Sequence, residues 1–300
     1  MLCRNVLILS VAALPLLAAA PANAAGATPA QIAKAVKDPA RPQMDMWRDP
    51  DRHPAEVVAF AGIKPGDVVV DFGPGNGYYT RIISKLVGAK GHVYPVVNLA
   101  GYRDARLIRE AEEKAGKKDA VDAILPLQFV GGFENVQVIW ENIARDKGVE
   151  LPQQVDAVFM SNVYHDMHNK AWGPLHVDTV VLPSLFLGTK PNGTLTVIDH
   201  ATAPGKGFSE TESLHRSDSE AVKKEVMAAG YLFDGESKVL ANAADDHTKP
   251  VFQLHDKTDQ YALRFKKPAN AGNGNRPKEN PYKAWEENTW HQPNLPDKFT

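Results

Sequence analysis

The sequence predicts an α/β fold: a doubly wound, mostly parallel sheet with an antiparallel closing strand. The segment DVVVDF, residues 67–72, is short and almost uniformly apolar, which is typical of a strand buried on both faces. Strand-like and helix-like segments then alternate along the chain, as they do in a doubly wound sheet. Two further strand-like segments, 231–240 and 259–268, come near the end and can close the sheet.

The remaining elements follow from the same periodicities. Further strands are expected at 92–97, 135–140 and 155–161, and residues 191–199 read as a turn into a fifth strand. Helices are expected at 53–62, 78–88, 101–122, 175–188 and 221–230. Pro54 suits the first turn of its helix, Pro183 bends or ends another helix, and Pro95 weakens its strand. Ser217 and Glu220 have the spacing of a capping box ahead of the last helix.

These elements define the domain organisation. Residues 51–268 are expected to form one domain, and 43% hydrophobic residues suffice for an ordinary core. Residues 25–50 read as a loose, alanine-rich lead-in with one short helix. Residues 269–300 are rich in Asn, Gly, Pro and Lys and read as a poorly packed tail.

The first 24 residues have the layout of a secretory signal peptide. Arg4 precedes an apolar run, residues 6–20, and small residues follow it up to Ala24. A membrane anchor is the alternative, but the run is shorter than the ~20 residues of a spanning helix and Pro15 interrupts it. We therefore expect cleavage after Ala24, export to the periplasm, and no stable membrane insertion once the leader is removed.

Composition excludes several classes of function. Cys3 is the only cysteine and lies in the leader, so the rest of the chain offers no disulfide, thiolate nucleophile or cysteine metal site. The 36 acidic residues nearly balance the 34 Lys and Arg, which argues against nucleic acid as the main partner. The oligomeric state is not predicted.

A glycine-rich turn, DFGPGNG, joins the strand at 67–72 to the next helix. Such a turn places backbone amides and a helix N-terminus beside a ligand at the carboxyl edge of the sheet. A dinucleotide fingerprint would need glycine at Tyr78, and a Walker loop would need Gly-Lys-Ser/Thr. What remains is Asp71 followed by Gly73, Gly75 and Gly77. From the glycines alone, a tight turn without any ligand remains an alternative.

This motif resembles the first motif of class I S-adenosylmethionine-dependent methyltransferases. The chain is most similar to a group of predicted bacterial methyltransferases with N-terminal leaders, at RDPDRHPAE, DFGPGNGYYT, NVYHDM, KPVF and LRFKKP. The resemblance spans about residues 52–268 and implies a Rossmann-like methyltransferase fold with S-adenosyl-L-methionine as cofactor. It implies that Asp71 and the three glycines wrap the methionine end, with the sulfonium near carboxylates or an aromatic face such as Tyr78.

The nucleoside side of the implied cofactor site departs from the family pattern. The family usually ends the second strand with an acid that accepts both ribose hydroxyls, and Val97 occupies that position here. The neighbouring Asn98 could accept one hydrogen bond, but loss of a charge-assisted pair costs about 1.5–3 kcal/mol. Glu141 matches the acid near the adenine amine; a solvated loop carboxylate is the alternative.

The fourth strand ends in FMSNVYHDMHN, which is similar to the HD element of small-molecule O-methyltransferases. The resemblance implies that His165 takes the proton from a hydroxyl, that Asp166 orients it or faces the cofactor, and that Asn162 lies near the methionine moiety. A purely structural His165 remains the alternative. Asp199 and His200 end the fifth strand and either line the acceptor site or satisfy loop amides. A metal cluster of these two residues with His165 lacks a close-spaced ligand pair, so no metal site is expected.

The leading hypothesis is therefore an S-adenosylmethionine-dependent methyltransferase acting on a small molecule, with a hydroxyl as the favoured acceptor. The alternative is an exported, non-catalytic binding protein that retains the fold; the leader and Val97 motivate it. A nicotinamide-dependent oxidoreductase is disfavoured by Tyr78 and by the missing ribose acid.

Overall fold

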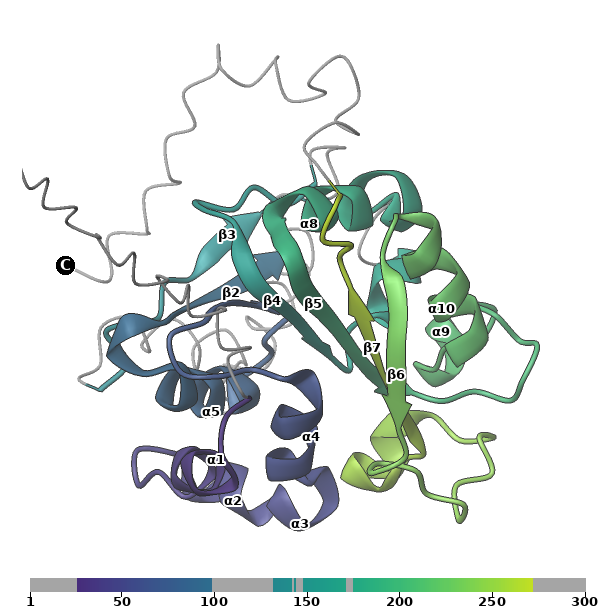
Figure 1. The fold of residues 1–300 in the computed structure, drawn as a ribbon. Helices are drawn as coiled ribbons and strands as arrows, with labels where there is room; N and C mark the ends of the chain where they lie inside the picture. The colour runs from purple at the N-terminus through teal and green to yellow at the C-terminus, as the bar shows by residue number, and fades with distance from the viewer. Residues whose placement is uncertain (1–25, 99–131, 142, 144–147, 171–174, 272–300) are drawn as a thin grey trace, which may run out of the picture.

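A computed structural model describes residues 26–98, 132–141, 143, 148–170 and 175–271 of the chain. These residues form a seven-stranded sheet in the order β3-β2-β1-β4-β5-β7-β6 (Figure 1). The strands are β1 (Val68–Phe72), β2 (His92–Asn98), β3 (Ile139–Glu141), β4 (Val155–Ser161), β5 (Thr189–His200), β6 (Leu232–Ser237) and β7 (Gln260–Lys266). β1 to β5 pair in parallel, and β7 runs antiparallel to both β5 and β6. The predicted fold class, a Rossmann-like methyltransferase fold, is confirmed.

Helices cover both faces of the sheet. One face carries α1 (Pro29–Val36), α4 (Pro54–Ala61) and α5 (Tyr78–Val87), whose apolar side chains form one core with β1 and β2. The other face carries α8 (Leu182–Gly188) and α10 (Ser219–Ala228), which pack into a second core with β4 and β5. Short elements complete the described chain: α2 (Gln43–Trp47), α3 (Asp49–Arg52), α9 (Thr211–Leu214), η1 (Gly88–Lys90), η4 (His165–His168), η6 (Val177–Val181), η7 (Val251–Gln253) and η8 (His255–Lys257). Within the described part of the chain, no helix has the length and apolar character needed to cross a membrane.

Several local expectations are modified by tertiary context. Pro95 lies within β2 because the pairing with the β3 side is interrupted there: an isolated bridge at Val93 precedes it, and the ladder begins only at Val96. The helix around Pro183 is not ended by that residue; α8 begins there, after the π-helical turn η6. The capping-box expectation for Ser217 is wrong, since Asp218 caps α10 by accepting the amide of Glu220.

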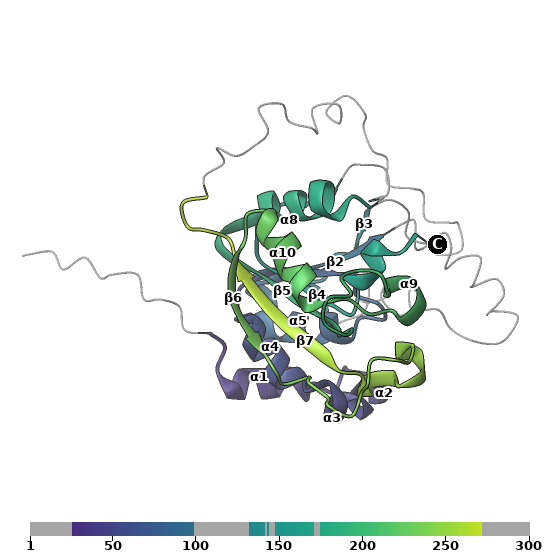
Figure 2. The ribbon, with the colours of Figure 1, turned by 90° about the vertical axis from the view of Figure 1, so that its right-hand side faces the viewer.

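The lead-in before residue 51 is not loose where the structure describes it. It contains α1, α2 and the start of α3, and Ile32 and Ala35 of α1 are buried against α4 and α5. Figure 2 shows α2 and α3 beside the segment that precedes β7. Arg48 and Arg52 join the two parts by ion pairs with Asp256, at 2.6 and 2.8 Å. The expected leader (1–24), the expected helix at 101–122 and most of the tail lie outside the described residues.

Candidate functional site

The glycine loop runs from the end of β1 to the start of α5, and its first two glycines face different surroundings. Gly73 has φ +65°, and a Cβ built there would lie 2.3 Å from Cγ2 of Val163, in the segment after β4. Gly75 has φ +55°, and no described atom lies within 4 Å of a Cβ at that position. Gly77 is the N-cap of α5 and supplies no side chain there. The loop is therefore packed against the segment after β4 at Gly73 and open at Gly75.

Asp71 lies beneath this loop and is almost wholly buried. Its carboxylate accepts a hydrogen bond from the hydroxyl of Thr80 on α5, at 2.5 Å. Burial raises the pKa of Asp71 to about 7, although the hydrogen bond from Thr80 acts in the opposite direction. The carboxylate that the resemblance implies is thus present; it contacts the first turn of α5 and is poorly solvated.

The lead-in helices hold the start of α5 from outside. Arg81 donates to the carbonyl oxygen of Asn76 in the glycine loop, at 2.8 Å, and pairs with Asp45 of α2 at 3.1 Å.

The Tyr78 hydroxyl donates to Asp49 at 2.6 Å, and its ring lies under the guanidinium groups of three arginines: Arg41, Arg48 and Arg52. Tyr78 is only 2% exposed, so the expectation that it offers its ring to a sulfonium is wrong.

The nucleoside-side candidates lie together at the ends of neighbouring strands. Asn98 and Glu141 are register partners, the last residues of β2 and β3. Asn98 is buried, and a carboxylate oxygen of Glu141 accepts the amide of Glu150 at 3.0 Å. Val97 is half-buried and packs against the core on the α5 face. The strand pairing thus places Asn98 and Glu141 side by side. The position of the ribose-binding acid that the resemblance implies is occupied by the apolar Val97.

Asn162 is the first residue after β4 and adopts a left-handed conformation with φ +56°. Its amide donates to the carbonyl of Ile198 at 2.8 Å, which fixes the turn. Its side-chain oxygen is buried and has no hydrogen-bond partner among the described residues. The next residue, Val163, packs on Gly73, so Asn162 belongs to the segment that contacts the glycine loop. A buried acceptor without a donor is costly, so a water molecule or a donor group of a ligand is expected to satisfy this oxygen.

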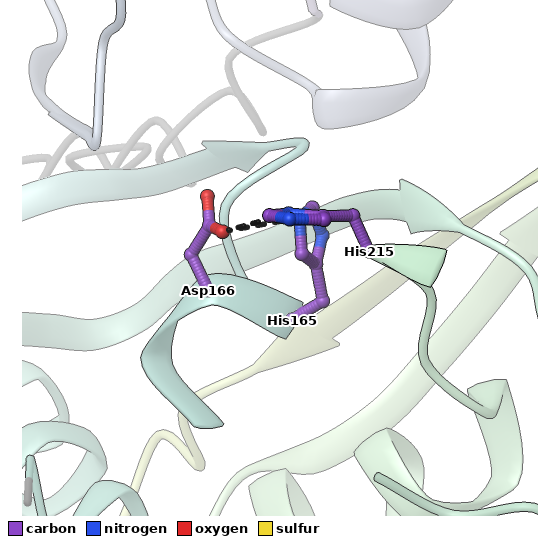
Figure 3. A group of neighbouring side chains, drawn as sticks. All are labelled: His165, Asp166 and His215. Carbon is purple, nitrogen blue, oxygen red and sulfur yellow. Dashed lines mark hydrogen bonds and ion pairs between the residues drawn. The ribbon is translucent and has the colours of Figure 1, made fainter. Parts of the chain in front are cut away.

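His165 opens the short helix η4 and is engaged on both ring nitrogens. Its Nδ1 contacts Asp199 at 2.7 Å, while its Nε2 lies 3.3 Å from Asp166 and 3.3 Å from Nδ1 of His215 (Figure 3). Asp199, fully buried at the end of β5, also accepts the backbone amides of His165 and His200. Of the two alternatives for Asp199, the acceptor site or hydrogen bonds to loop amides, the structure supports the second, since Asp199 accepts these two amides. Asp199 also orients the His165 ring, and Asp166 contacts the opposite nitrogen.

The two carboxylates determine the charge of this cluster. Burial alone would lower the pKa of His165, but the charge of Asp199 and the hydrogen bonds with Asp166 and Asp199 raise it to about 10. Burial would raise the pKa of Asp166, but hydrogen bonds with His165 and His215 lower it to about 2. His200 differs: burial lowers its pKa to about 4, and its Nδ1 lies 2.7 Å from the Thr258 hydroxyl. At neutral pH His165 is therefore charged and His200 neutral.

The sequence singled out most of these residues but missed His215. It lies 50 residues beyond His165, in the turn after α9, and no spacing pattern links the two. Phe252 was missed as well, although KPVF was noted as a similarity; its ring packs edge-on to His215 at 4.6 Å and is 66% exposed. Tertiary contact alone identifies both residues.

Comparison with known proteins finds similar solved structures of low sequence identity. No protein-family model matches the chain, and no match was found among curated proteins. A S-adenosylmethionine-dependent methyltransferase from Aquifex aeolicus has a similar structure, with 20% identity, a TM-score of 0.48, and coverage of 80% of this chain and 98% of that chain. An arsenic(III) S-adenosylmethionine methyltransferase from Chlamydomonas reinhardtii has 15% identity, a TM-score of 0.45, and coverage of 82% and 76%. Aeropyrum pernix fibrillarin with natively bound S-adenosyl-L-methionine has 12% identity, a TM-score of 0.40, and coverage of 68% and 67%.

Proposed function

We propose that this chain is a methyltransferase that uses S-adenosyl-L-methionine to methylate a small molecule, with a hydroxyl as the acceptor. One observation carries the proposal. The open loop at Gly75, the unpartnered oxygen of Asn162 and the His165 cluster follow β1 and β4, which pair in parallel, so they share one edge of the sheet. In an open α/β sheet this edge is where ligands bind.

The residues present fit the cofactor on its methionine side. Asp71 and the loop from Gly73 to Gly77 would hold the amino-acid part, and the free oxygen of Asn162 would accept one of its donors. Asn98 and Glu141 would bind the nucleoside part of the cofactor by hydrogen bonds. The carboxylate that usually binds the ribose at the end of the second strand would be missing. The cofactor itself would supply a methyl group on a positively charged sulfur.

The cluster after β4 would form the acceptor side. Methyl transfer is a direct displacement, so its rate depends on alignment of the acceptor oxygen with the methyl carbon. His165, fixed by Asp199, and the more exposed Asp166 are the groups placed to hold that oxygen. With a pKa of about 10, His165 must first give up its proton before it can act as the general base that the resemblance implies.

Calorimetric titration with S-adenosyl-L-methionine tests the proposal directly. Gly75→Val fills the open side of the loop and should weaken binding by roughly tenfold or more, an effect of about 1.4 kcal/mol. Gly66→Val is the matched control, because Gly66 also has positive φ and no described neighbour within 4 Å but precedes β1, at the opposite end of that strand. No binding at millimolar ligand, or equal binding by Gly75→Val, would overturn the proposal.

Val97→Asp tests the nucleoside side, with Val97→Asn as its uncharged control. A carboxylate that pairs with the ribose hydroxyls should raise affinity by roughly tenfold or more, because charge-assisted bonds contribute about 1.5–3 kcal/mol. Tight binding without methyl transfer to hydroxyl, amine or thiol acceptors would instead favour an exported binding protein. Export after cleavage at Ala24 is part of the proposal, and N-terminal sequencing of the native protein from separated cell compartments tests it.

A further inference from the structure

We infer that His165, Asp166 and His215 form a binding site for one divalent metal ion of the zinc type. The three residues come from two separate segments, η4 after β4 and the turn after α9. Each offers one ligand atom: Nε2 of His165, a carboxylate oxygen of Asp166 and Nδ1 of His215 (Figure 3). Two imidazoles and one carboxylate are a common ligand set for catalytic zinc.

The three ligand atoms form a nearly equilateral triangle. Nε2 of His165 lies 3.3 Å from the Asp166 oxygen and 3.3 Å from Nδ1 of His215, and the latter two atoms are 3.4 Å apart. Zinc–nitrogen and zinc–oxygen bonds are about 2.0–2.2 Å long, so tetrahedral ligands lie about 3.3–3.6 Å from each other. An octahedral ion with bonds of about 2.1 Å would need ligands about 3.0 Å apart. The spacing of the three ligand atoms therefore matches tetrahedral coordination.

The surrounding residues orient the ligands as they do in metal sites. Asp199 lies 2.7 Å from Nδ1 of His165, so that nitrogen donates to the carboxylate and Nε2 faces the triangle. A metal ion that binds there displaces the proton of Nε2. Asn169 donates to the ligating oxygen of Asp166 at 3.1 Å. A carboxylate behind a histidine ligand fixes its tautomer and makes it a stronger electron donor.

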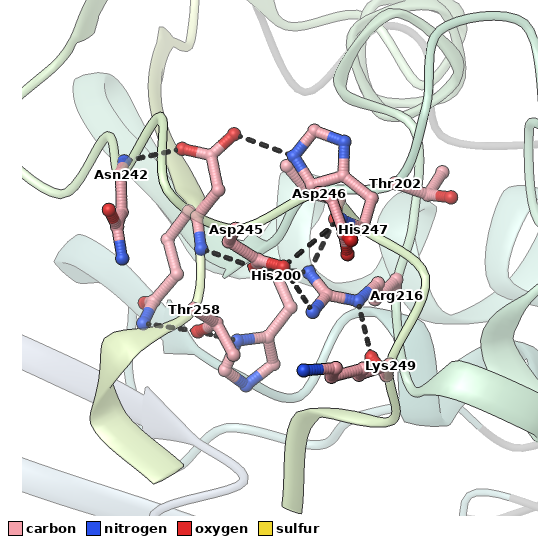
Figure 4. Close-up of polar contacts among 12 residues, drawn as sticks. His200, Thr202, Arg216, Asn242, Asp245, Asp246, His247, Lys249 and Thr258 are labelled. Atoms are coloured by element: carbon pink, nitrogen blue, oxygen red, sulfur yellow. Dashed lines mark hydrogen bonds and ion pairs between the residues drawn. The ribbon is translucent and has the colours of Figure 1, made fainter. Parts of the chain in front are cut away.

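His215 is held in place by its neighbour in the chain. Arg216 is fully buried and forms a bidentate pair with Asp245 at 2.8 and 3.0 Å (Figure 4). The same guanidinium donates to the carbonyl oxygens of Ala201 and Lys249. This anchor lets His215 keep a left-handed backbone with φ +55°, which is unfavourable for a non-glycine residue unless its surroundings enforce it.

Three protein ligands leave the fourth tetrahedral position open, as in catalytic zinc sites. The His165 side chain is 4% exposed, whereas those of Asp166 and His215 are 22% and 26% exposed, so the site is closed beneath and open on one side. A water molecule or an oxygen donor of a small molecule can occupy that position. If the methyltransferase proposal holds, this ligand would be the acceptor hydroxyl, activated by the metal rather than by an imidazole base.

Binding of metal alone, without cofactor or acceptor, tests the inference independently of the proposed function. The purified protein, freed of metal with a chelator, would be titrated with Zn²⁺ by calorimetry and with Co²⁺ by visible absorption. We expect one metal ion per chain and the intense visible bands of tetrahedral cobalt. His215→Ala should weaken zinc binding by roughly 100-fold or more, since even loss of an outer-shell partner costs 10–100-fold.

Two further variants keep the test decisive. His168→Gln is the matched control, because His168 belongs to the same short helix but contacts Glu225 instead, at 3.1 Å; it should bind zinc as the wild type does. His215→Cys replaces one zinc ligand by another and should restore binding and shift the cobalt spectrum. Absence of stoichiometric binding by the wild type, or equal binding by a folded His215→Ala variant, would overturn the inference.

Discussion

Replacement of Gly73 by alanine provides a quantitative test of how the glycine loop is packed. The new Cβ would lie 2.3 Å from Cγ2 and 2.9 Å from Cβ of Val163. A rotamer change of Val163 moves its methyl groups but not its Cβ, so the backbone after β4 must also shift. Overpacking of this kind costs about 1–3 kcal/mol. The left-handed conformation at φ +65° adds about 1–2 kcal/mol for a residue with a Cβ.

Gly75→Ala is the matched variant because it shares the strain but not the clash. Its φ is +55° and no described atom lies within 4 Å of the added methyl group, so we expect a loss of about 1–2 kcal/mol. Gly73→Ala should lose about 2–5 kcal/mol, a large part of the 5–15 kcal/mol by which typical domains are stable. Urea denaturation followed by tryptophan fluorescence gives both values, provided that the slope of the transition is unchanged.

A double-mutant cycle assigns the difference to Val163. In the Gly73→Ala background, Val163→Ala removes the methyl group that would lie closest, so part of the lost stability should return. We expect a coupling of at least about 1 kcal/mol between the two substitutions, above the roughly 0.5 kcal/mol scatter of independent sites. Equal destabilisation by Gly73→Ala and Gly75→Ala, or additive effects in the cycle, would refute this description of the loop.

Two buried carboxylates give further predictions. Burial raises the pKa of Asp71 to about 7, so the folded state keeps this proton at pH values where the unfolded state has lost it. The free energy of unfolding should therefore fall by up to about 4 kcal/mol as pH rises from 4 to 7. Urea denaturation across this pH range should show the fall in the wild type and a smaller one in Asp71→Asn. Asp245→Ala should destabilise the protein by about 3–5 kcal/mol because it leaves the buried Arg216 unpaired. Lys238→Ala, which breaks only the exposed pair with Glu236, should change the melting temperature little, and equal shifts would contradict this account.

Local sequence patterns predicted most of the elements because they depend on near neighbours. Apolar runs and helical periodicity located β1, β4 and α5, and the glycines located the turn between β1 and α5. Expectations based on the residue type at a single position, such as those for Pro95 and Ser217, were less accurate. Pro95 is tolerated because β3 does not pair with it, and Ser217 is drawn inward to the hydroxyl of Tyr261, at 2.6 Å, rather than capping α10.

The sequence by itself determined the sheet, the acid–glycine turn and the placement of Asn162 and His165 at its carboxyl edge. Parallel strands share that edge, so residues that follow them must come together. Only the tertiary structure decided which groups meet there: it brings Asp199 and His215 to His165 and covers the ring of Tyr78 with three arginines. These contacts join segments tens of residues apart, and their distances depend on how the intervening loops and helices pack, which no local pattern encodes.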